Sequence, residues 1–350
     1  MPRVPASHDR SRAGTAVAGT AATRREVRQP DPAGGSTVGR PLTARSVIAS
    51  ILLPLDRPEL PGRSLVRCCE LFGIAEGTTR VALSRMVARH ELEQVDGGYR
   101  LTGPMLERQA RQRAARWPKL RPWSGSWLVS VVVAERRDAA ERAMLRGVLR
   151  HHRMAELREG VWARPDNVDG MVVALAASGA STAVGPVVSA GGTVAPVTGG
   201  LVVPDGEGEK GGGLAINGEL GSVIEHCLWL RAVPAADLGA PDDRGLAGRL
   251  WDLDRWASQA RSLLADLDRT LPRLQAGDAA ALAPCFVVAA AAVRHVTADP
   301  LLPGELLPDR WPADELRSRY ETYEQDYGRL LASWLGGASP AIGTGADGGT

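Results

Sequence analysis

The sequence has few lysines, few phenylalanines and none of the residue spacings that build metal or disulfide sites. Only two of its 42 Lys and Arg residues are lysines, so its positive charge is almost entirely arginine. The four cysteines, Cys68, Cys69, Cys227 and Cys285, form no CxxC pair, and none of the six histidines lies at metal-ligand spacing. These absences argue against a zinc site and a disulfide-stapled secreted fold, and they favour buried thiols in a reducing cytoplasm.

The chain also lacks the short motifs of the large enzyme classes. It has no GxSxG nucleophile turn, no protein-kinase motif set and no dinucleotide fingerprint set between a strand and a helix. The glycine-rich stretch at 206–213 is not a phosphate loop, because Lys210 is followed by Gly211 rather than by Ser or Thr. The sequence therefore predicts a protein that is not an enzyme, with no catalytic residue, no metal ligand and no cofactor.

Positive charge is concentrated in one part of the chain. Residues 40–122 contain 15 Arg or Lys and 8 Asp or Glu, a net charge of +7, whereas residues 123–350 carry 21 and 29, a net charge of −8. A basic segment in an otherwise acidic chain is typical of a nucleic-acid-binding region.

The stretch at 60–102 predicts two helices followed by a hairpin. The first helix is expected from about Pro61 to Phe72 and ends at Gly73, because glycine commonly follows a helix C-terminus. The second helix is expected from about Glu76 to His90. A further helix at Leu42–Leu53 would pack beneath them.

The hairpin is predicted from the turn residues Asp96-Gly97-Gly98. They join Glu91–Val95 to Tyr99–Leu101, and the glycines supply the positive φ of a tight turn. Helices followed by such a hairpin predict a winged helix-turn-helix, which lays one helix in the major groove of DNA.

The second helix has an apolar stripe and an opposite polar face. The stripe predicted to be buried comprises Thr79, Ala82, Leu83, Met86 and Val87. The residues predicted to face DNA are Thr78, Arg80, Val81, Ser84 and Arg85. Arg80 and Arg85 are the best candidates for guanine or phosphate, since arginine offers a bidentate fork. Arg100 on the hairpin is expected to contact the DNA backbone.

Four separated motifs resemble one known family. They are GRSLVRCCELFGIAEGTTRVALSRMVARHELE at 62–93, REGVWARPDN at 158–167, LWDLDRWA at 250–257 and ADPLLPGELLPDRWP at 298–312. In this order they resemble the PaaX-like regulators, the repressor family of phenylacetic-acid degradation. The resemblance extends from about Pro41 to Leu335, except for one internal block.

The resemblance implies a transcriptional repressor of a catabolic operon with an α+β multidomain fold. It implies a ferredoxin-like middle domain, and an acyl-CoA effector such as phenylacetyl-CoA that binds the C-terminal part and releases double-stranded DNA. One winged helix recognises too few base pairs to find a site in a genome, so we expect a homodimer on a pseudo-palindromic operator.

The remaining segments predict a small α+β domain and a helical C-terminal part. Strands are expected at 127–133, 154–163 and 227–233, with a helix at Asp138–His152. A leucine rhythm at 246–271 predicts a helix. The apolar run at 279–293, which Pro284 interrupts and which is too short to cross a membrane, predicts a buried one. Three tyrosines on a last helix at 316–334 favour core packing over an effector-stacking surface.

These elements suggest five regions and one insertion. They are a tail at 1–40, a winged helix with its connecting helix at 41–122, a middle domain at 123–240 with a low-complexity insertion at about 176–222, a helical domain at 241–336 and a tail at 337–350.

Two other hypotheses remain at this stage. The first is a metal-dependent nuclease that uses Glu135 or Asp138, although these residues also fit a strand end and a helix cap. The second is a helical interaction protein whose winged helix is degenerate. The connecting helix Met105–Arg116 is expected to be solvated, with phosphate contact as the alternative for its arginines.

Overall fold

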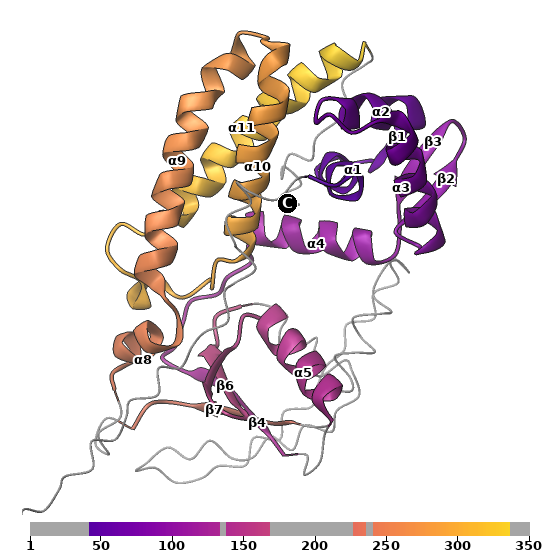
Figure 1. Ribbon diagram of the computed structural model, residues 1–350. Helices are drawn as coiled ribbons and strands as arrows, with labels where there is room; N and C mark the ends of the chain where they lie inside the picture. The colour runs from indigo at the N-terminus through magenta and orange to yellow at the C-terminus, as the bar shows by residue number, and fades with distance from the viewer. Residues whose placement is uncertain (1–41, 134–137, 169–226, 236–240, 337–350) are drawn as a thin grey trace, which may run out of the picture. The chain divides into compact units, whose positions relative to one another are not determined.

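The structure is a computed structural model that describes residues 42–133, 138–168, 227–235 and 241–336. The predicted tails and the predicted insertion at 176–222, along with Glu135, lie outside these residues. Two small sheets are followed by a helical part, so the fold is α+β (Figure 1). The elements are α1 (Ala44–Leu52), β1 (Glu59–Pro61), α2 (Gly62–Glu70), α3 (Glu76–Ala88), β2 (Leu92–Val95), β3 (Gly98–Leu101), α4 (Pro104–Arg116), β4 (Trp127–Val132), α5 (Ala139–His151), β5 (Ala155–Arg158), β6 (Val161–Pro165), β7 (Cys227–Ala232), α8 (Asp243–Leu250), α9 (Leu253–Gln275), η3 (Ala279–Ala281), α10 (Leu282–Thr297), η4 (Gly304–Leu306) and α11 (Ala313–Leu335).

Local sequence signals set the ends of the first helices. α1 starts with a capping box, in which the Ser46 N–H donates to Thr43 Oγ1 at 3.2 Å and the Thr43 N–H donates to Ser46 Oγ at 3.0 Å. α2 ends at Glu70, two residues earlier than predicted, and Gly73, with φ of 69°, closes the turn that follows it. α3 ends at Ala88, two residues earlier than predicted, and His90 has φ of 55°.

The first sheet contains a strand that the sequence did not predict. β1 pairs with β3, which also pairs with β2, so the antiparallel order is β1-β3-β2. Gly98 is required where β1 crosses β3, because a Cβ there would lie 2.4 Å from the Leu60 carbonyl oxygen. The sequence shows no strand pattern here, because β1 has only three residues and ends in Pro61.

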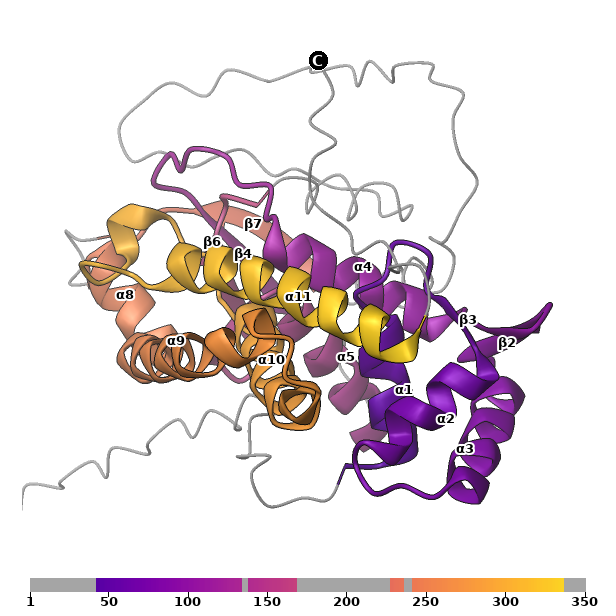
Figure 2. The same ribbon diagram turned by 90° about the horizontal axis from the view of Figure 1, so that it is seen from above.

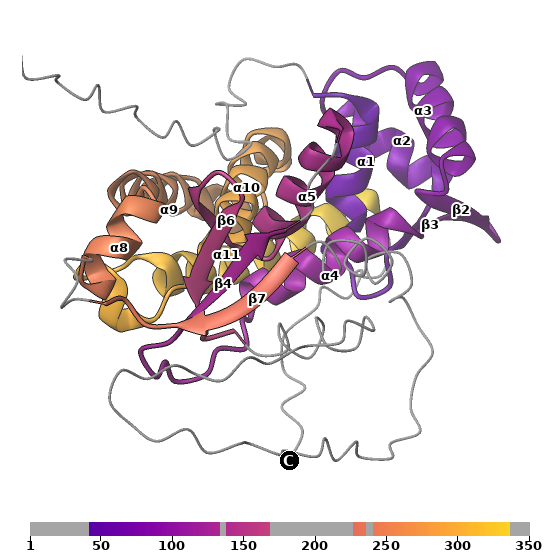
Figure 3. The ribbon, with the colours of Figure 1, turned by 90° about the horizontal axis from the view of Figure 1, so that it is seen from below.

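The second sheet, named here the middle sheet, has four antiparallel strands in the order β5-β6-β4-β7. α5 covers one of its faces, where Leu145 and Leu149 pack with Trp162 and Cys227 (Figure 3). The prediction of one strand at 154–163 is wrong. The chain turns at Gly160, whose φ is 75°, and forms the β5–β6 hairpin instead.

The motifs that carry the family resemblance form joints between segments. Arg164 is buried and donates to Asn167 Oδ1 at 3.0 Å, while Asn167 donates to the Leu301 carbonyl at 3.0 Å. Trp256 stacks on Trp311 with ring centroids 4.6 Å apart. These residues therefore hold the middle sheet and the C-terminal helices to the loop at 298–312.

The C-terminal helices α9, α10 and α11 pack against one another (Figure 1). The leucine rhythm at 246–271 is divided between α8 and α9, because Asp252 starts α9 as its N-cap and accepts from the Arg255 N–H at 3.2 Å. The helix predicted at 279–293 is present as η3 and α10, and Pro284 does not break it. Pro284 lies in the first turn of α10, where its missing N–H has no intrahelical partner to lose.

One described helical stretch, Ala279–Thr297, is long and apolar enough to cross a membrane by length and composition, so the expectation that the run at 279–293 is too short is wrong. Core helices of water-soluble proteins meet the same criterion. Here the α10 part of the stretch packs on α4, α9 and α11, and Phe286 and Val296 are buried between helices.

One hydrophobic cluster includes both α1–α4, named here the N-terminal region, and the C-terminal helices. Phe72 meets Phe286 with ring centroids 4.8 Å apart. Tyr320, Tyr323 and Tyr327 are all buried in this cluster, which confirms their core-packing interpretation. α10 and α11 run beside the N-terminal region in Figures 1 and 2.

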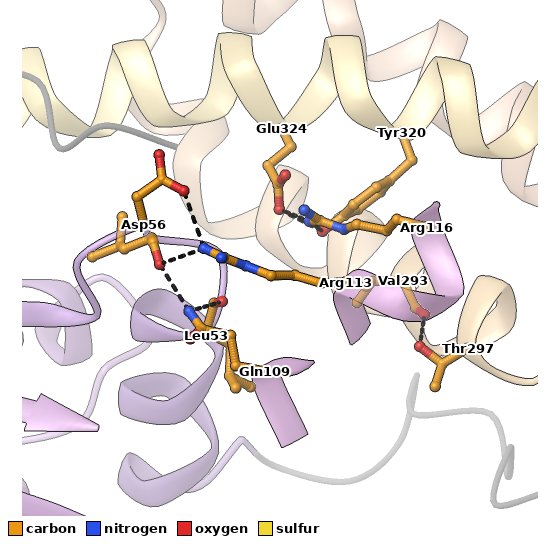
Figure 4. Close-up of polar contacts among 10 residues, drawn as sticks. Leu53, Asp56, Gln109, Arg113, Arg116, Val293, Thr297, Tyr320 and Glu324 are labelled. Atoms are coloured by element: carbon orange, nitrogen blue, oxygen red, sulfur yellow. Dashed lines mark hydrogen bonds and ion pairs between the residues drawn. The ribbon is translucent and has the colours of Figure 1, made fainter. Parts of the chain in front are cut away.

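The prediction that α4 is a solvated connecting helix is wrong. The Gln109 amide is buried and donates to the Leu53 carbonyl at 2.9 Å, and Arg113 forms an ion pair with Asp56 at 3.0 Å (Figure 4). At its end, Arg116 forms a buried ion pair with Glu324 of α11. α4 is therefore the helix through which the N-terminal region contacts the C-terminal helices.

Breaking the Arg116–Glu324 pair is expected to destabilise the fold strongly. Glu324→Gln leaves the guanidinium buried beside a neutral amide, and breaking a buried pair in this way costs about 3–5 kcal/mol. The control is Asp268→Asn, because Asp268 and Arg319 pair at 2.6 Å with side chains 49% and 39% exposed. An exposed pair contributes ~0.2–1 kcal/mol. Urea unfolding of the full chain measures both losses, and equal losses would contradict the account.

Candidate nucleic-acid interface

The exposed face of α3 is the main feature of the candidate interface. The stripe predicted to be buried is confirmed, since Thr79, Leu83 and Met86 are buried and Ala82 and Val87 are half-buried. The opposite face is exposed to solvent. It presents all five predicted contact residues of this helix, which are Thr78, Arg80, Val81, Ser84 and Arg85.

These side chains form a mixed surface of hydroxyl, apolar and cationic groups. Val81 is 51% exposed, which leaves its methyl groups available for contact with a base. The Arg80 guanidinium is held by Glu76 at 2.9 Å, but both side chains are exposed, and an i,i+4 pair of this kind is worth only about 0.3–0.5 kcal/mol. The Arg85 side chain has no ion-pair or hydrogen-bond partner among the described residues.

Arg100 lies on β3 between two carboxylates. Its guanidinium forms ion pairs with Glu59 of β1 at 2.7 Å and with Glu93 of β2 at 3.2 Å. Both partners stand directly opposite Arg100 in the register of the sheet. The three charges sum to −1, so a phosphate has to displace at least one glutamate to reach this arginine.

An open groove of about 890 Å³ lies between α2, the start of α3 and the β2–β3 turn. Three arginines and four acidic residues line it, namely Arg63, Arg67, Arg80, Glu59, Glu70, Glu76 and Asp96. The groove is therefore of mixed charge, and the basic surface lies on the exposed face of α3. Sequence reasoning missed Arg63 and Arg67, because it sought contact residues only on the second predicted helix and on the hairpin.

Arg67 connects the groove to the C-terminal helices. Its guanidinium donates to the carbonyls of Trp334 at 2.9 Å and Leu335 at 3.1 Å, the last residues of α11. It also lies 4.5 Å from the centre of the Trp334 ring. A cation at a helix C-terminus satisfies carbonyls that lack intrahelical partners.

The candidate catalytic residue Asp138 and the thiol of Cys68 have positions that fit a structural role. Asp138 caps α5, where its side chain accepts from the Glu141 N–H at 2.8 Å. Within the described ranges no group of three or more His, Cys, Asp or Glu side chains is placed to hold a metal. Burial raises the pKa of the Cys68 thiol to about 12, so it stays protonated and unreactive at neutral pH.

Two family models match two separate segments of the chain. The model described as PaaX-like protein matches residues 43–105, and the model described as PaaX-like protein C-terminal domain matches residues 251–336. Among solved structures, the uncharacterized protein Rv0674 from Mycobacterium tuberculosis is similar, with 33% sequence identity and a TM-score of 0.55 over 83% of this chain and 98% of that chain. No curated protein matches the chain.

These matches place the chain in a family of transcriptional regulators. The chain belongs to the PaaX-like family. The resemblance inferred from the four motifs is thus confirmed. The two matched segments contain α3 and the β2–β3 hairpin on one side, and α9 to α11 on the other.

Proposed function

We propose that this chain is a sequence-specific DNA-binding repressor that reads its operator with α3. The observation that carries the proposal is the division of α3 into a buried stripe and an exposed face of polar and cationic side chains. In this proposal α1, α2, α3 and the β1-β3-β2 sheet form a winged helix-turn-helix, with the β2–β3 hairpin as its wing.

Each residue on the exposed face of α3 is assigned a role by its chemistry. Two N–H groups of the Arg85 guanidinium donate to the O6 and N7 of a guanine. Arg80 makes the same contact or binds phosphate. Thr78 and Ser84 hydrogen-bond to base edges or phosphate oxygens, and Val81 packs on a thymine methyl group.

The wing contributes backbone contacts that position the duplex. Arg100 remains the proposed phosphate ligand there, and binding exchanges its ion pair with Glu59 or Glu93 for one with phosphate. Arg63 is a second candidate. It is exposed at the start of α2, lines the groove and has no ion-pair partner among the described residues.

The rest of the chain is proposed to sense a metabolite and to control α3. The strand order of the middle sheet and the placement of α5 support the proposal of a ferredoxin-like domain at 123–240. An acyl-CoA such as phenylacetyl-CoA is the proposed effector. The proposed target is an operon for aromatic-acid breakdown, and the proposed location of the regulator is the cytoplasm. In this proposal the contacts of Arg67 and Arg116 with α11 link the effector-binding part of the chain to the DNA-binding helix α3.

The proposed assembly is a homodimer that places two copies of α3 on a pseudo-palindromic operator, with half-sites about one helical turn apart. β7 is an edge strand of the middle sheet, and it carries Leu228 and Leu230, which are 42% and 39% exposed. Because they are two residues apart, both lie on the face opposite α5. An exposed apolar face on an edge strand supports an interface there.

Arg85→Ala is expected to weaken operator binding by about 1–3 kcal/mol, because it removes a bidentate contact from an exposed position. Arg261→Ala is the matched control. Arg261 is an exposed arginine on α9, so the change in net charge is the same. Fluorescence anisotropy against operator and scrambled duplexes measures both. Unaltered operator affinity in Arg85→Ala at an unchanged thermal midpoint would remove Arg85 from the interface.

Leu228→Glu combined with Leu230→Glu is expected to convert the dimer into a monomer, because four carboxylates would meet across a two-fold axis. Light scattering of the full chain should give twice the 37.0 kDa chain mass for the wild type and one chain mass for the double variant. Leu106→Glu, at an apolar position of α4 that is 41% exposed, is the control and should stay dimeric. A double variant that remains dimeric would exclude the β7 face.

A further inference from the structure

Two arginines of α2 line the groove beside α3. Arg63 and Arg67 are four residues apart, so they lie on the same side of the helix. Both are exposed, and the groove that they line also includes Arg80 from the exposed face of α3. Both guanidinium groups therefore lie next to the surface that is proposed to face DNA.

The two arginines differ in what they contact. The Arg63 side chain has no ion-pair or hydrogen-bond partner among the described residues. Arg67 is held by the last turn of α11, where it donates to the carbonyls of Trp334 at 2.9 Å and Leu335 at 3.1 Å and lies 4.5 Å from the centre of the Trp334 ring. The end of α11 lies beside α2 in Figures 1 and 2. α11 therefore occupies the donors of one arginine and leaves the other open to a ligand.

The acceptors that hold Arg67 are neutral. The two carbonyls satisfy N–H groups of the guanidinium but do not balance its charge. Within the ranges that the structure describes, Arg67 forms no ion pair with a carboxylate. A phosphate accepts two parallel N–H bonds from one guanidinium and also neutralises it. A phosphate of DNA is therefore able to displace the carbonyls.

The last turn of α11 is able to release Arg67 without opening the core. Ala332 is the last buried residue of the helix, and Trp334 and Leu335 are only half-buried. The final carbonyls of a helix lack intrahelical partners, and helix ends open more readily than the middle of a packed helix. Arg116, by contrast, meets α11 in a buried ion pair. Of these two polar contacts, that of Arg67 is the exchangeable one.

We propose that Arg67 is a second phosphate ligand on α2 and that the end of α11 withholds it from DNA. The state with Arg67 on the Trp334 and Leu335 carbonyls is the state of weaker DNA binding. When the last turn of α11 moves away, Arg63 and Arg67, whose Cβ atoms are about 5–6 Å apart, both face the backbone of one DNA strand. This role rests on the proposed DNA-binding function, and it names the contact through which the C-terminal helices lower the affinity.

The salt dependence of binding to a random DNA duplex tests this role in the full chain. Trp334→Pro removes the ring and unwinds the last turn of α11, because proline lacks the N–H and clashes with the carbonyl four residues earlier. One added phosphate contact steepens the slope of log affinity against log salt by about 0.9. A fourfold rise in salt should therefore weaken binding by Trp334→Pro about 3.5-fold more than binding by the wild type.

Arg67→Gln in both backgrounds shows whether the added contact is made by Arg67. In the wild type it should leave the slope unchanged, whereas in Trp334→Pro it should return the slope to the wild-type value. Both members of the second comparison carry the same proline, so a general effect of the proline on the fold cancels. Trp334→Ala removes only the ring and should steepen the slope in the same direction, which keeps the test decisive if the proline variant does not fold.

Two controls separate this effect from a general change of charge or of α11. Arg261→Gln removes the same charge from an exposed position of α9 and should leave the slope unchanged in both backgrounds. Ser333→Ala lies in the same turn of α11 as Trp334, keeps the ring and both carbonyls, and should bind DNA like the wild type.

Three results overturn the role of Arg67 while DNA binding itself persists. They are a wild-type slope in Trp334→Pro and Trp334→Ala, a steeper slope that survives Arg67→Gln, and an equal effect of Arg67→Gln in both backgrounds. In the last case Arg67 binds phosphate without hindrance from α11. Operator reading by α3 fails separately, through an unaltered operator affinity of Arg85→Ala. Absence of any duplex binding by the wild type and the Trp334 variants overturns both.

Discussion

The buried contact of Arg116 with Glu324 and Tyr320 holds the N-terminal region against the C-terminal helices. Arg116 donates to the Tyr320 hydroxyl at 3.1 Å, and that hydroxyl donates to the Glu324 carboxylate at 2.9 Å (Figure 4). An unpaired charge at this depth is very costly, so the three groups are stable only when α4 and α11 are in register. Burial raises the pKa of Glu324, and the Arg116 guanidinium acts in the opposite direction and favours its carboxylate form. The contact therefore fixes the position of α4, and through Gln109 and Arg113 the position of the α1–β1 turn.

This joint makes α3 part of a larger body. Leu83 and Met86 of α3 belong to the same buried cluster as Phe286 and Leu331 of the C-terminal helices. Arg67 adds a second link, since one side chain both lines the groove beside α3 and caps α11. A ligand that favours one of two positions of α11 would thereby favour one of two positions of α3, which is the physical requirement for coupling between distant sites.

The sequence predicted the elements with strong periodicity or clear end signals. The buried stripe of α3, the turn at Gly97 and the cap at Asp138 follow from local chemistry, and the structure contains them. Features fixed by distant partners were missed. The burial of Arg116 depends on Glu324, more than 200 residues away, and β1 is a strand only because β3 pairs with it. The candidate face of α3 was predictable from helical spacing, whereas the pairing of Arg100 with Glu59 required the strand register.

Native-state hydrogen exchange most directly tests whether the N-terminal region and the C-terminal helices form one cooperative body. The amides of Leu83 in α3 and Leu331 in α11 lie in the shared core and should report the same opening event. With increasing denaturant, their opening free energies should fall along one line to the global unfolding value. If the Leu83 amide exchanges through an opening that leaves Leu331 protected, the two segments unfold independently and the account is contradicted.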